Sequence, residues 1–202
     1  MAAQIYLIRH GETEWSNARR YAGRLDIALT DRGEGQGRLL GKMLERAMFA
    51  QVWVSPLRRA IRTCELAGLS KGSRADRRLI EWDFGKYEGS TTSAIRAKRP
   101  GWSLFRDGCP GGESAEQLAV RVESVIKELQ SLEGCVALFS HKQFLRSLAV
   151  RWIGLPIESA GHFSLDTGSL SVLSFSPGDT PVAVISRWNA GANGLVEGAP
   201  QP

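Results

Sequence analysis

Three short and almost entirely apolar runs, at residues 4–8, 51–54 and 135–139, alternate along the chain with segments of helical periodicity. Strands that are apolar on both faces are typical of parallel sheets covered by helices on each side. Strands that alternate with helices also favour parallel pairing, because each helix serves as the crossover connection. The pattern therefore predicts an α/β fold: a three-layer sandwich around a mostly parallel central sheet.

The remaining elements follow from apolar stripes and from residues that favour helix ends, such as Thr30 as an N-cap and Ser114 with Gln117 as a capping box. Helices are predicted over residues 30–49, 56–67, 91–98, 114–129 and 143–152. Further strands are predicted to end at residue 80 and to cover residues 170–175 and 182–186. The segment after Trp188 is rich in Gly, Ala and Pro and is predicted to be loose.

Two segments do not fit the strand–helix alternation. Residues 11–29 lack a clear period and are predicted to form a long loop, a kind of segment that is usually functional. Residues 82–112 are rich in Gly, Pro and aromatic side chains. We expect them to form a lid-like insertion over the site, within a single domain that spans residues 1–202.

The chain has a net charge of +5 and a sequence pI near 9.4, which favours anionic partners. Its basic residues are dispersed, so we expect neither nucleic-acid nor membrane binding. The sequence has no signal-peptide pattern and no apolar run of the ~18 residues that a membrane span needs. Cys64, Cys109 and Cys135 match no metal motif and are expected to be reduced thiols of a cytoplasmic protein. The oligomeric state stays open between a monomer and a homodimer.

Polar side chains follow the predicted strands where each strand ends: Arg9-His10, Arg58-Arg59, Glu81 and His141. In an open α/β sheet, ligands bind outside the carboxyl ends of the strands. A neutral imidazole can accept a phosphoryl group, while arginines and a protonated histidine bind its oxygens. A carboxylic acid can protonate the leaving oxygen. This set suits phosphoryl transfer without a metal ion.

The same residues lie in four motifs that resemble those of the histidine phosphatase superfamily, in the same order: Leu7–Thr13, Ser55–Thr63, Glu81–Gly89 and Phe139–His141. This superfamily includes the cofactor-dependent phosphoglycerate mutases. The resemblance implies that His10 is the nucleophile that becomes phosphohistidine. It implies that Arg9, Arg59 and His141 complete the phosphate pocket, with Arg58 on the surface. Glu81 would be the proton donor and would later help water to attack; no cofactor is implied.

Finer details resemble the sugar-phosphate phosphatases of the superfamily, including sedoheptulose-bisphosphatase-like members and small bacterial acid phosphatases. They occur at residues 15–16, 21–23, 81–83 and 106–114. The mutases carry Asn where this chain has Ser16, and they have longer insertions. We therefore favour a phosphatase that acts on small phosphorylated metabolites, sugar phosphates in particular. The alternatives are a cofactor-dependent phosphoglycerate mutase and a phosphate-binding module without turnover.

The residues expected to contact substrate are Gly11, Ser16, Ala22, Gly23, Trp82, Phe84 and Lys142. Two of them depart from the family pattern: Lys142 stands where Gly is usual, and Ala22 where Ser or Thr is common. Lys142 could hinder close approach of the backbone to a ligand, or direct its ammonium at a second anionic group of the substrate. The sequence also leaves bland alternatives open. Glu81 could form only a salt bridge with a pocket arginine, and His162 is expected to be partly buried and structural.

Overall fold

The computed structural model describes residues 4–191 and shows one six-stranded sheet with the strand order β3-β2-β4-β1-β5-β6. Its strands are β1 (Gln4–Arg9), β2 (Phe49–Val54), β3 (Arg74–Ala75), β4 (Cys135–Ser140), β5 (Ser169–Phe175) and β6 (Ala183–Gly191). Strands β1 to β4 pair in parallel, β5 runs antiparallel to β1, and β6 runs antiparallel to β5. The predicted mostly parallel α/β sheet is confirmed.

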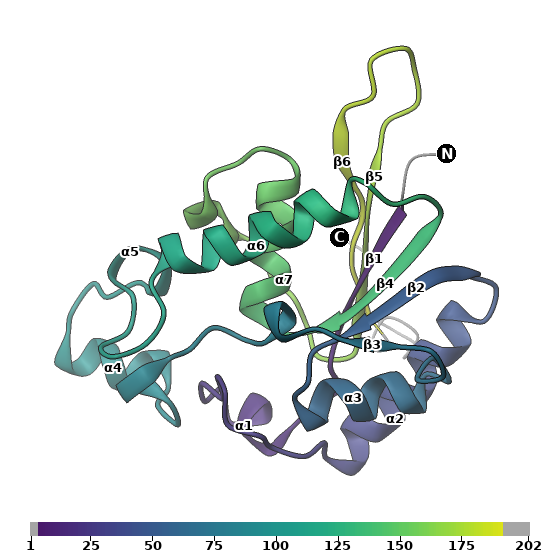
Figure 1. Ribbon diagram of the computed structural model, residues 1–202. Helices are drawn as coiled ribbons and strands as arrows, with labels where there is room; N and C mark the ends of the chain where they lie inside the picture. The colour runs from purple at the N-terminus through teal and green to yellow at the C-terminus, as the bar shows by residue number, and fades with distance from the viewer. Residues whose placement is uncertain (1–3, 192–202) are drawn as a thin grey trace, which may run out of the picture.

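Helices cover both faces of the sheet (Figure 1). Helices α2 (Asp31–Leu44) and α3 (Arg58–Leu66) lie on one face, while α6 (Ala115–Leu129) and α7 (Lys142–Trp152) lie on the other. Successive side chains of a strand point to opposite faces, so each strand contributes to two cores. In β1, Ile5 and Leu7 pack into the core with α6 and α7, whereas Ile8 packs into the core with α2 and α3.

Several predicted helix starts are confirmed by their hydrogen bonds. The hydroxyl of Thr30 accepts from the N–H of Gly33 at the start of α2. Ser114 and Gln117 form the predicted reciprocal capping box of α6. These bonds satisfy backbone donors that a helix N-terminus leaves without a partner.

Four boundaries differ from the sequence prediction. Helix α2 ends at Leu44 rather than near residue 49, because Phe49 already pairs with Cys135 in the sheet. The prediction of a strand that ends at residue 80 is wrong. Strand β3 covers only residues 74–75, and a 3-10 helix, η1 (Arg77–Leu79), follows it. The loop over residues 11–29 contains a short helix, α1 (Glu14–Asn17). Strand β6 continues to Gly191, and the rest of the tail predicted to be loose lies outside the described residues.

The segment 82–112 contains η2 (Gly85–Tyr87), α4 (Thr92–Lys98) and α5 (Leu104–Asp107), and lies beside α1, away from the sheet (Figure 1). Arg20 forms an isolated β-bridge with Thr91, and the hydroxyl of Tyr21 is 2.8 Å from that of Thr92. A last 3-10 helix, η3 (Ile157–His162), follows α7. Over residues 4–191, no helix is long and apolar enough to cross a membrane.

Candidate active site

The register of the parallel strands brings the two histidines together. Arg9 pairs with Ser140 across β1 and β4, so His10 and His141 are the next residues at the same edge. Their ring centroids are 5.2 Å apart. This edge is the carboxyl end of the parallel strands, where α/β folds bind ligands.

A cavity of about 760 Å³ opens at this edge, within the size range of metabolite sites. Four of the five predicted catalytic residues line it: Arg9, His10, Arg59 and Glu81. Basic side chains dominate its wall, namely Arg9, Arg19, Arg20, Arg32, Arg59, Arg96, Lys142 and Arg146. Its carboxylates are Glu12, Glu81 and Asp166. The positive excess suits an anionic ligand.

The hydrogen bonds of His10 define which ring nitrogen can react. Its Nδ1 lies 2.7 Å from the carbonyl oxygen of Gly11. A carbonyl oxygen only accepts, so Nδ1 carries the hydrogen and the lone pair of the neutral ring is on Nε2. Burial, reinforced by Arg59 and Arg9, holds the pKa of His10 well below its usual value. His10 is therefore a neutral imidazole with a free nucleophilic nitrogen at neutral pH.

His141 lies behind the cavity wall rather than on it. It is fully buried, its Nδ1 accepts from Arg59 Nε at 3.1 Å, and its Nε2 is 2.7 Å from the hydroxyl of Ser55. Arginine only donates, so the neutral ring of His141 carries its hydrogen on Nε2. This N–H donates a hydrogen bond to the hydroxyl oxygen of Ser55. Burial and the nearby Arg59 keep the pKa of His141 well below its usual value. In this arrangement the neutral ring orients Arg59, and contact of His141 with a phosphate group stays a prediction.

The two buried histidines predict a loss of stability on mild acidification. An unfolded histidine has a pKa near 6.5, whereas the pKa values of folded His10 and His141 are lower. Below about pH 6.5 the unfolded chain therefore binds protons that the folded chain does not. The free energy of unfolding should fall by up to about 1.4 kcal/mol per pH unit for each histidine.

Urea denaturation at pH 7.0 and pH 5.5 measures this loss. Carboxylates such as Glu128, whose pKa is lowered by its bond to Arg78, titrate below this window. His162, which is exposed rather than partly buried as expected, supplies the control: His162→Ala should keep the full pH dependence, and His10→Ala should reduce it. Equal stability of the wild type at both pH values would contradict the assignment.

Arg59 connects the second motif to the loop before α2. Besides its bond to His141, its two terminal nitrogens donate at 2.7 Å to the carbonyl oxygens of Leu25 and Gly23. The side chain is 1 % exposed, and burial lowers its pKa. The guanidinium is thus held in one orientation at the cavity wall, which suits a fork of N–H donors for phosphate oxygens.

Arg9 is the last residue of β1 and directly precedes His10. Its Nη1 donates to the carbonyl oxygen of Leu165 at 2.5 Å, while its buried Nε has no protein partner. Burial lowers the pKa of Arg9 to about 10, opposed by the nearby carboxylates of Glu81 and Asp166. Arg9 therefore stays a cation at neutral pH and keeps donor capacity for a ligand.

The carboxylate of Glu81 is held by backbone N–H groups. Its Oε1 accepts from Trp82, Gln143 and Phe144, whereas its Oε2 accepts only from Gln143. Over residues 4–191 no arginine pairs with Glu81 within 4.0 Å, so the alternative of a salt bridge is not realised. Oε2 is the oxygen with room to hold a proton.

Five residues expected to contact substrate line the cavity: Ser16, Ala22, Gly23, Phe84 and Lys142. Two do not. The indole of Trp82 is fully buried in the core and donates to the carbonyl oxygen of Glu113, so the expected substrate contact is wrong. Gly11 also lies off the cavity wall.

Gly11 serves packing rather than ligand approach. A Cβ on Gly11 would lie 2.2 Å from the carbonyl oxygen of Gly33, and a Cβ on Gly33 would lie 2.1 Å from that of Glu12. This close approach seats the turn after β1 against α2. The N–H of Gly11 donates to the hydroxyl of Thr63 in α3, which fixes the turn from a second side.

Sequence reasoning missed Arg19 and Arg146, which line the cavity, and Asp166 beside Arg9. Arg146 lies one helical turn after Lys142, a spacing that places both side chains on one face of α7. That spacing was available in the sequence. Nothing in the sequence indicates the backbone of Arg19, whose φ of 54° is rare for a residue with a side chain.

The sequence pattern of the histidine phosphatase superfamily (branch 1) matches residues 5–190. The chain belongs to the histidine phosphatase superfamily. The matched span includes the residues that the structure gathers around His10, namely Arg9, Arg59, Glu81 and His141. Over residues 4–191 no cluster of three or more His, Cys, Asp or Glu side chains could hold a metal ion.

Relatives within the histidine phosphatase superfamily include proteins named for different reactions. An acid phosphatase of Mycobacterium tuberculosis is 36% identical over 98% of this chain and 95% of its own length. A sedoheptulose 1,7-bisphosphatase of Saccharomyces cerevisiae is 33% identical over 78% of this chain and 70% of its own. A probable phosphoglycerate mutase of Photorhabdus laumondii is 32% identical over 85% of each chain.

Solved structures of phosphatases share this fold. A mycobacterial glucosyl-3-phosphoglycerate phosphatase in complex with VO3 superposes with a TM-score of 0.82 at 27% identity, covering 93% of this chain and 99% of that one. Superfamily and relatives together support phosphatase activity for this chain.

Proposed function

We propose that the protein is a metal-independent phosphatase that hydrolyses small phosphorylated metabolites, sugar phosphates among them, through a phosphohistidine on His10. The observation that carries the proposal is the free Nε2 lone pair of a neutral His10 at a cavity wall rich in arginine. A neutral nucleophile beside fixed cations is what attack on a phosphate ester requires.

In the first step, Nε2 of His10 attacks phosphorus and the bond to the leaving oxygen breaks. Glu81 enters this step as a carboxylic acid and gives its proton to that oxygen, which leaves as an alcohol. The phosphorylated ring becomes cationic, which strengthens the donation from Nδ1 to the carbonyl oxygen of Gly11. Arg9 and Arg59 stabilise the charge that spreads over the phosphoryl oxygens in the transition state.

In the second step, a water molecule attacks the phosphorus of phospho-His10. The carboxylate of Glu81 accepts a proton from that water, and the N–P bond breaks. The products are inorganic phosphate and a neutral His10, so both residues return to their starting states.

The preference for sugar phosphates draws support from relatives. The yeast relative is named a sedoheptulose 1,7-bisphosphatase, and the structural relative a glucosyl-3-phosphoglycerate phosphatase. Both names describe substrates with a phosphate on a small polar metabolite. A cavity of about 760 Å³ with mostly polar and charged walls fits such a molecule.

Glu81→Gln tests the proton donor. The amide oxygen can keep the bonds from Gln143 and Phe144, but the side chain cannot donate an acidic proton. We expect kcat/KM, which reports the first step alone, to fall by about 10²- to 10⁴-fold for alkyl phosphates and far less for 4-nitrophenyl phosphate, because nitrophenolate leaves without protonation. Phosphate release, measured with a chelator present, gives both rates.

Glu14→Gln, an exposed carboxylate on α1, is the control and should leave both rates unchanged. If Glu81→Gln slowed the first step equally for alkyl and aryl esters, Glu81 would not be the group that protonates the leaving oxygen. Loss of wild-type activity on adding the chelator would refute metal independence.

The likeness to the probable phosphoglycerate mutase makes a mutase the second candidate. That reaction requires the phosphoryl group of phospho-His10 to return to a phosphoglycerate instead of passing to water. Following a labelled phosphate from 3-phosphoglycerate, with a bisphosphoglycerate present, separates transfer from release. A binding module without turnover would bind phosphate esters and never form phosphohistidine.

A further inference from the structure

We propose that Lys142, Arg146 and Arg19 form a second anion site in the same cavity, which selects substrates that carry a second phosphate or a carboxylate besides the phosphoryl group that reacts. The inference rests on the proposed phosphatase function and specifies its substrate class. We call these three residues the second anion site.

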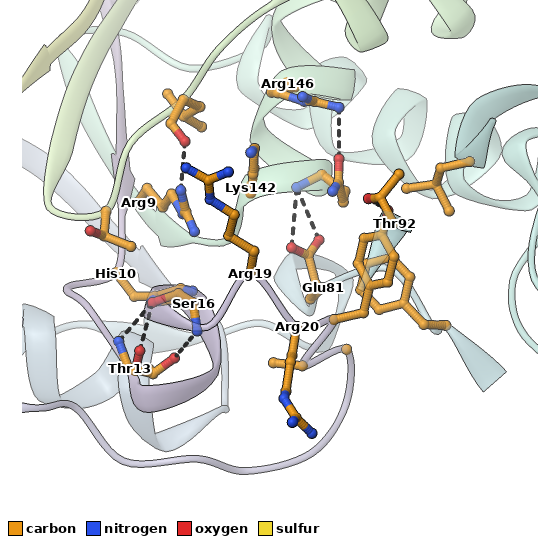
Figure 2. A pocket seen from close by; sticks show the side chains of 18 of the residues that line it. Arg9, His10, Thr13, Ser16, Arg19, Arg20, Glu81, Thr92, Lys142 and Arg146 are labelled. Carbon is orange, nitrogen blue, oxygen red and sulfur yellow. Dashed lines mark hydrogen bonds between the residues drawn. The ribbon is translucent and has the colours of Figure 1, made fainter. Parts of the chain in front are cut away.

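The first support is the crowding of cations on α7. Lys142 and Arg146 lie one helical turn apart and line the cavity, and Lys142 lies between Arg9 and Arg146 in Figure 2. Burial, with Arg9 and Arg146 nearby, lowers the pKa of Lys142 to about 8, although Glu81 and Asp166 oppose the shift. Positive groups that repel one another are stabilised when an anion binds between them.

The second support is donor capacity that the protein leaves unused. Over residues 4–191 no carboxylate pairs with Lys142 within 4.0 Å. Arg146 donates from Nη1 to the carbonyl oxygen of Phe163 and from Nη2 to the side-chain oxygen of Gln143, and each of these nitrogens has a second N–H. Lys142 and the remaining N–H groups of Arg146 can therefore donate to an anionic group of a ligand.

The third support is the backbone of Arg19. Its φ of 54° is a left-handed conformation that glycine adopts without strain and arginine does not. Its side chain lines the cavity and points towards Arg9 and Lys142 (Figure 2). Strained residues gather at ligand sites, where the side chain is used.

The location explains how one ligand reaches both sites. Arg9 lies next to His10, and its charge is felt by Lys142. A single metabolite in a cavity of about 760 Å³ can therefore present one phosphate to His10 and a second anion to Lys142. The single phosphate of an aryl ester fills only the first position.

Inhibition constants test the second anion site without requiring that the probe be turned over. Fructose 1,6-bisphosphate and fructose 6-phosphate compete with 4-nitrophenyl phosphate, and 3-phosphoglycerate is compared in the same way with glycerol 3-phosphate. In the wild type, the second anion should lower Ki (or KM, where the probe is hydrolysed) by at least about tenfold in one of the pairs, which corresponds to about 1.4 kcal/mol.

The variants assign that preference to residues. Lys142→Met should reduce the preference by about tenfold. Arg19→Gly should reduce it severalfold without lowering the melting temperature, because glycine relieves the strained φ. Lys42→Met removes the same charge from an exposed position on α2 and should keep the preference. For each of the three variants, kcat for 4-nitrophenyl phosphate is measured as well, so that a general loss of activity can be separated from a loss of preference.

Three results would overturn the second anion site: less than twofold preference in both pairs of the wild type, an unchanged preference in Lys142→Met, or equal loss for one-anion and two-anion probes. A failure of the phosphatase proposal has a different signature, namely no hydrolysis of 4-nitrophenyl phosphate. In that case, calorimetric titration of the wild type and Lys142→Met with the same pairs still decides whether the second anion is bound.

Discussion

His10→Ala is expected to reduce kcat/KM for 4-nitrophenyl phosphate by about 10⁴-fold or more, because removal of a covalent nucleophile removes the reaction path itself. The fold should survive the change. The imidazole makes a single side-chain hydrogen bond, to the neighbouring carbonyl of Gly11, and strand pairing holds its backbone. The circular dichroism spectrum of the variant should therefore match that of the wild type.

His162→Ala is the matched control, since this histidine is exposed at the end of η3. Its activity should equal that of the wild type. Phosphohistidine is hydrolysed in acid but survives in base. The intermediate is therefore trapped by rapid denaturation in base after the protein is mixed with labelled substrate. Label on wild-type protein but not on His10→Ala is the expected result. Residual activity within tenfold of the wild type would exclude His10 as the nucleophile.

The central sheet and its sequence order could be predicted because apolar patterning reports burial directly. The runs at 4–8, 51–54 and 135–139 lie in β1, β2 and β4; β1 and β4 are buried over most of their length, and β2 is buried at Trp53 and Val54. The error at residue 80 has a physical reason. Leu79 is fully buried like a strand residue, but the carboxylate of Asp76 caps a turn that begins two residues earlier. Burial without length does not distinguish a strand from a 3-10 turn.

The candidate site could be predicted where chemistry and motif agree, as for His10, Arg59 and Glu81, which line one cavity. The sequence could not give protonation states. The lowered pKa of His141 results from its burial and then from the charge of Arg59, a residue 82 positions away. Nor could an aromatic such as Trp82 be assigned to the core or to the cavity, because both environments favour it.

Arg59→Met is expected to lower kcat/KM for 4-nitrophenyl phosphate by about 10³-fold and also to destabilise the fold. Catalysis loses a fixed cation at the phosphoryl group. Folding loses the donor to the carbonyl oxygens of Gly23 and Leu25, and the buried one, that of Gly23, costs about 1–3 kcal/mol when it is left without a partner. Steady-state kinetics and urea denaturation measure the two effects separately.

Arg59→Lys separates charge from geometry. A lysine keeps a cation but has no planar fork, so it cannot donate to His141, Gly23 and Leu25 together. We expect it to recover part of the activity and little of the stability. Arg58→Ala is the matched control: its side chain is exposed, and the bond from its backbone N–H to Asp26 is unaffected by truncation.

If Arg58→Ala and Arg59→Met lost equal activity, the cation would act only through the net charge of the protein, and the orientation of Arg59 would be irrelevant. If Arg59→Lys matched the wild type in both measurements, the three hydrogen bonds would have no role beyond placing a charge. The expected order, with Arg58→Ala unaffected and Arg59→Lys between the wild type and Arg59→Met, follows from a guanidinium that His141 orients and the loop before α2 holds. Arg59 would then act in two ways: it would donate to the phosphoryl oxygens, and it would connect His141 to the loop before α2 through its hydrogen bonds to Gly23 and Leu25.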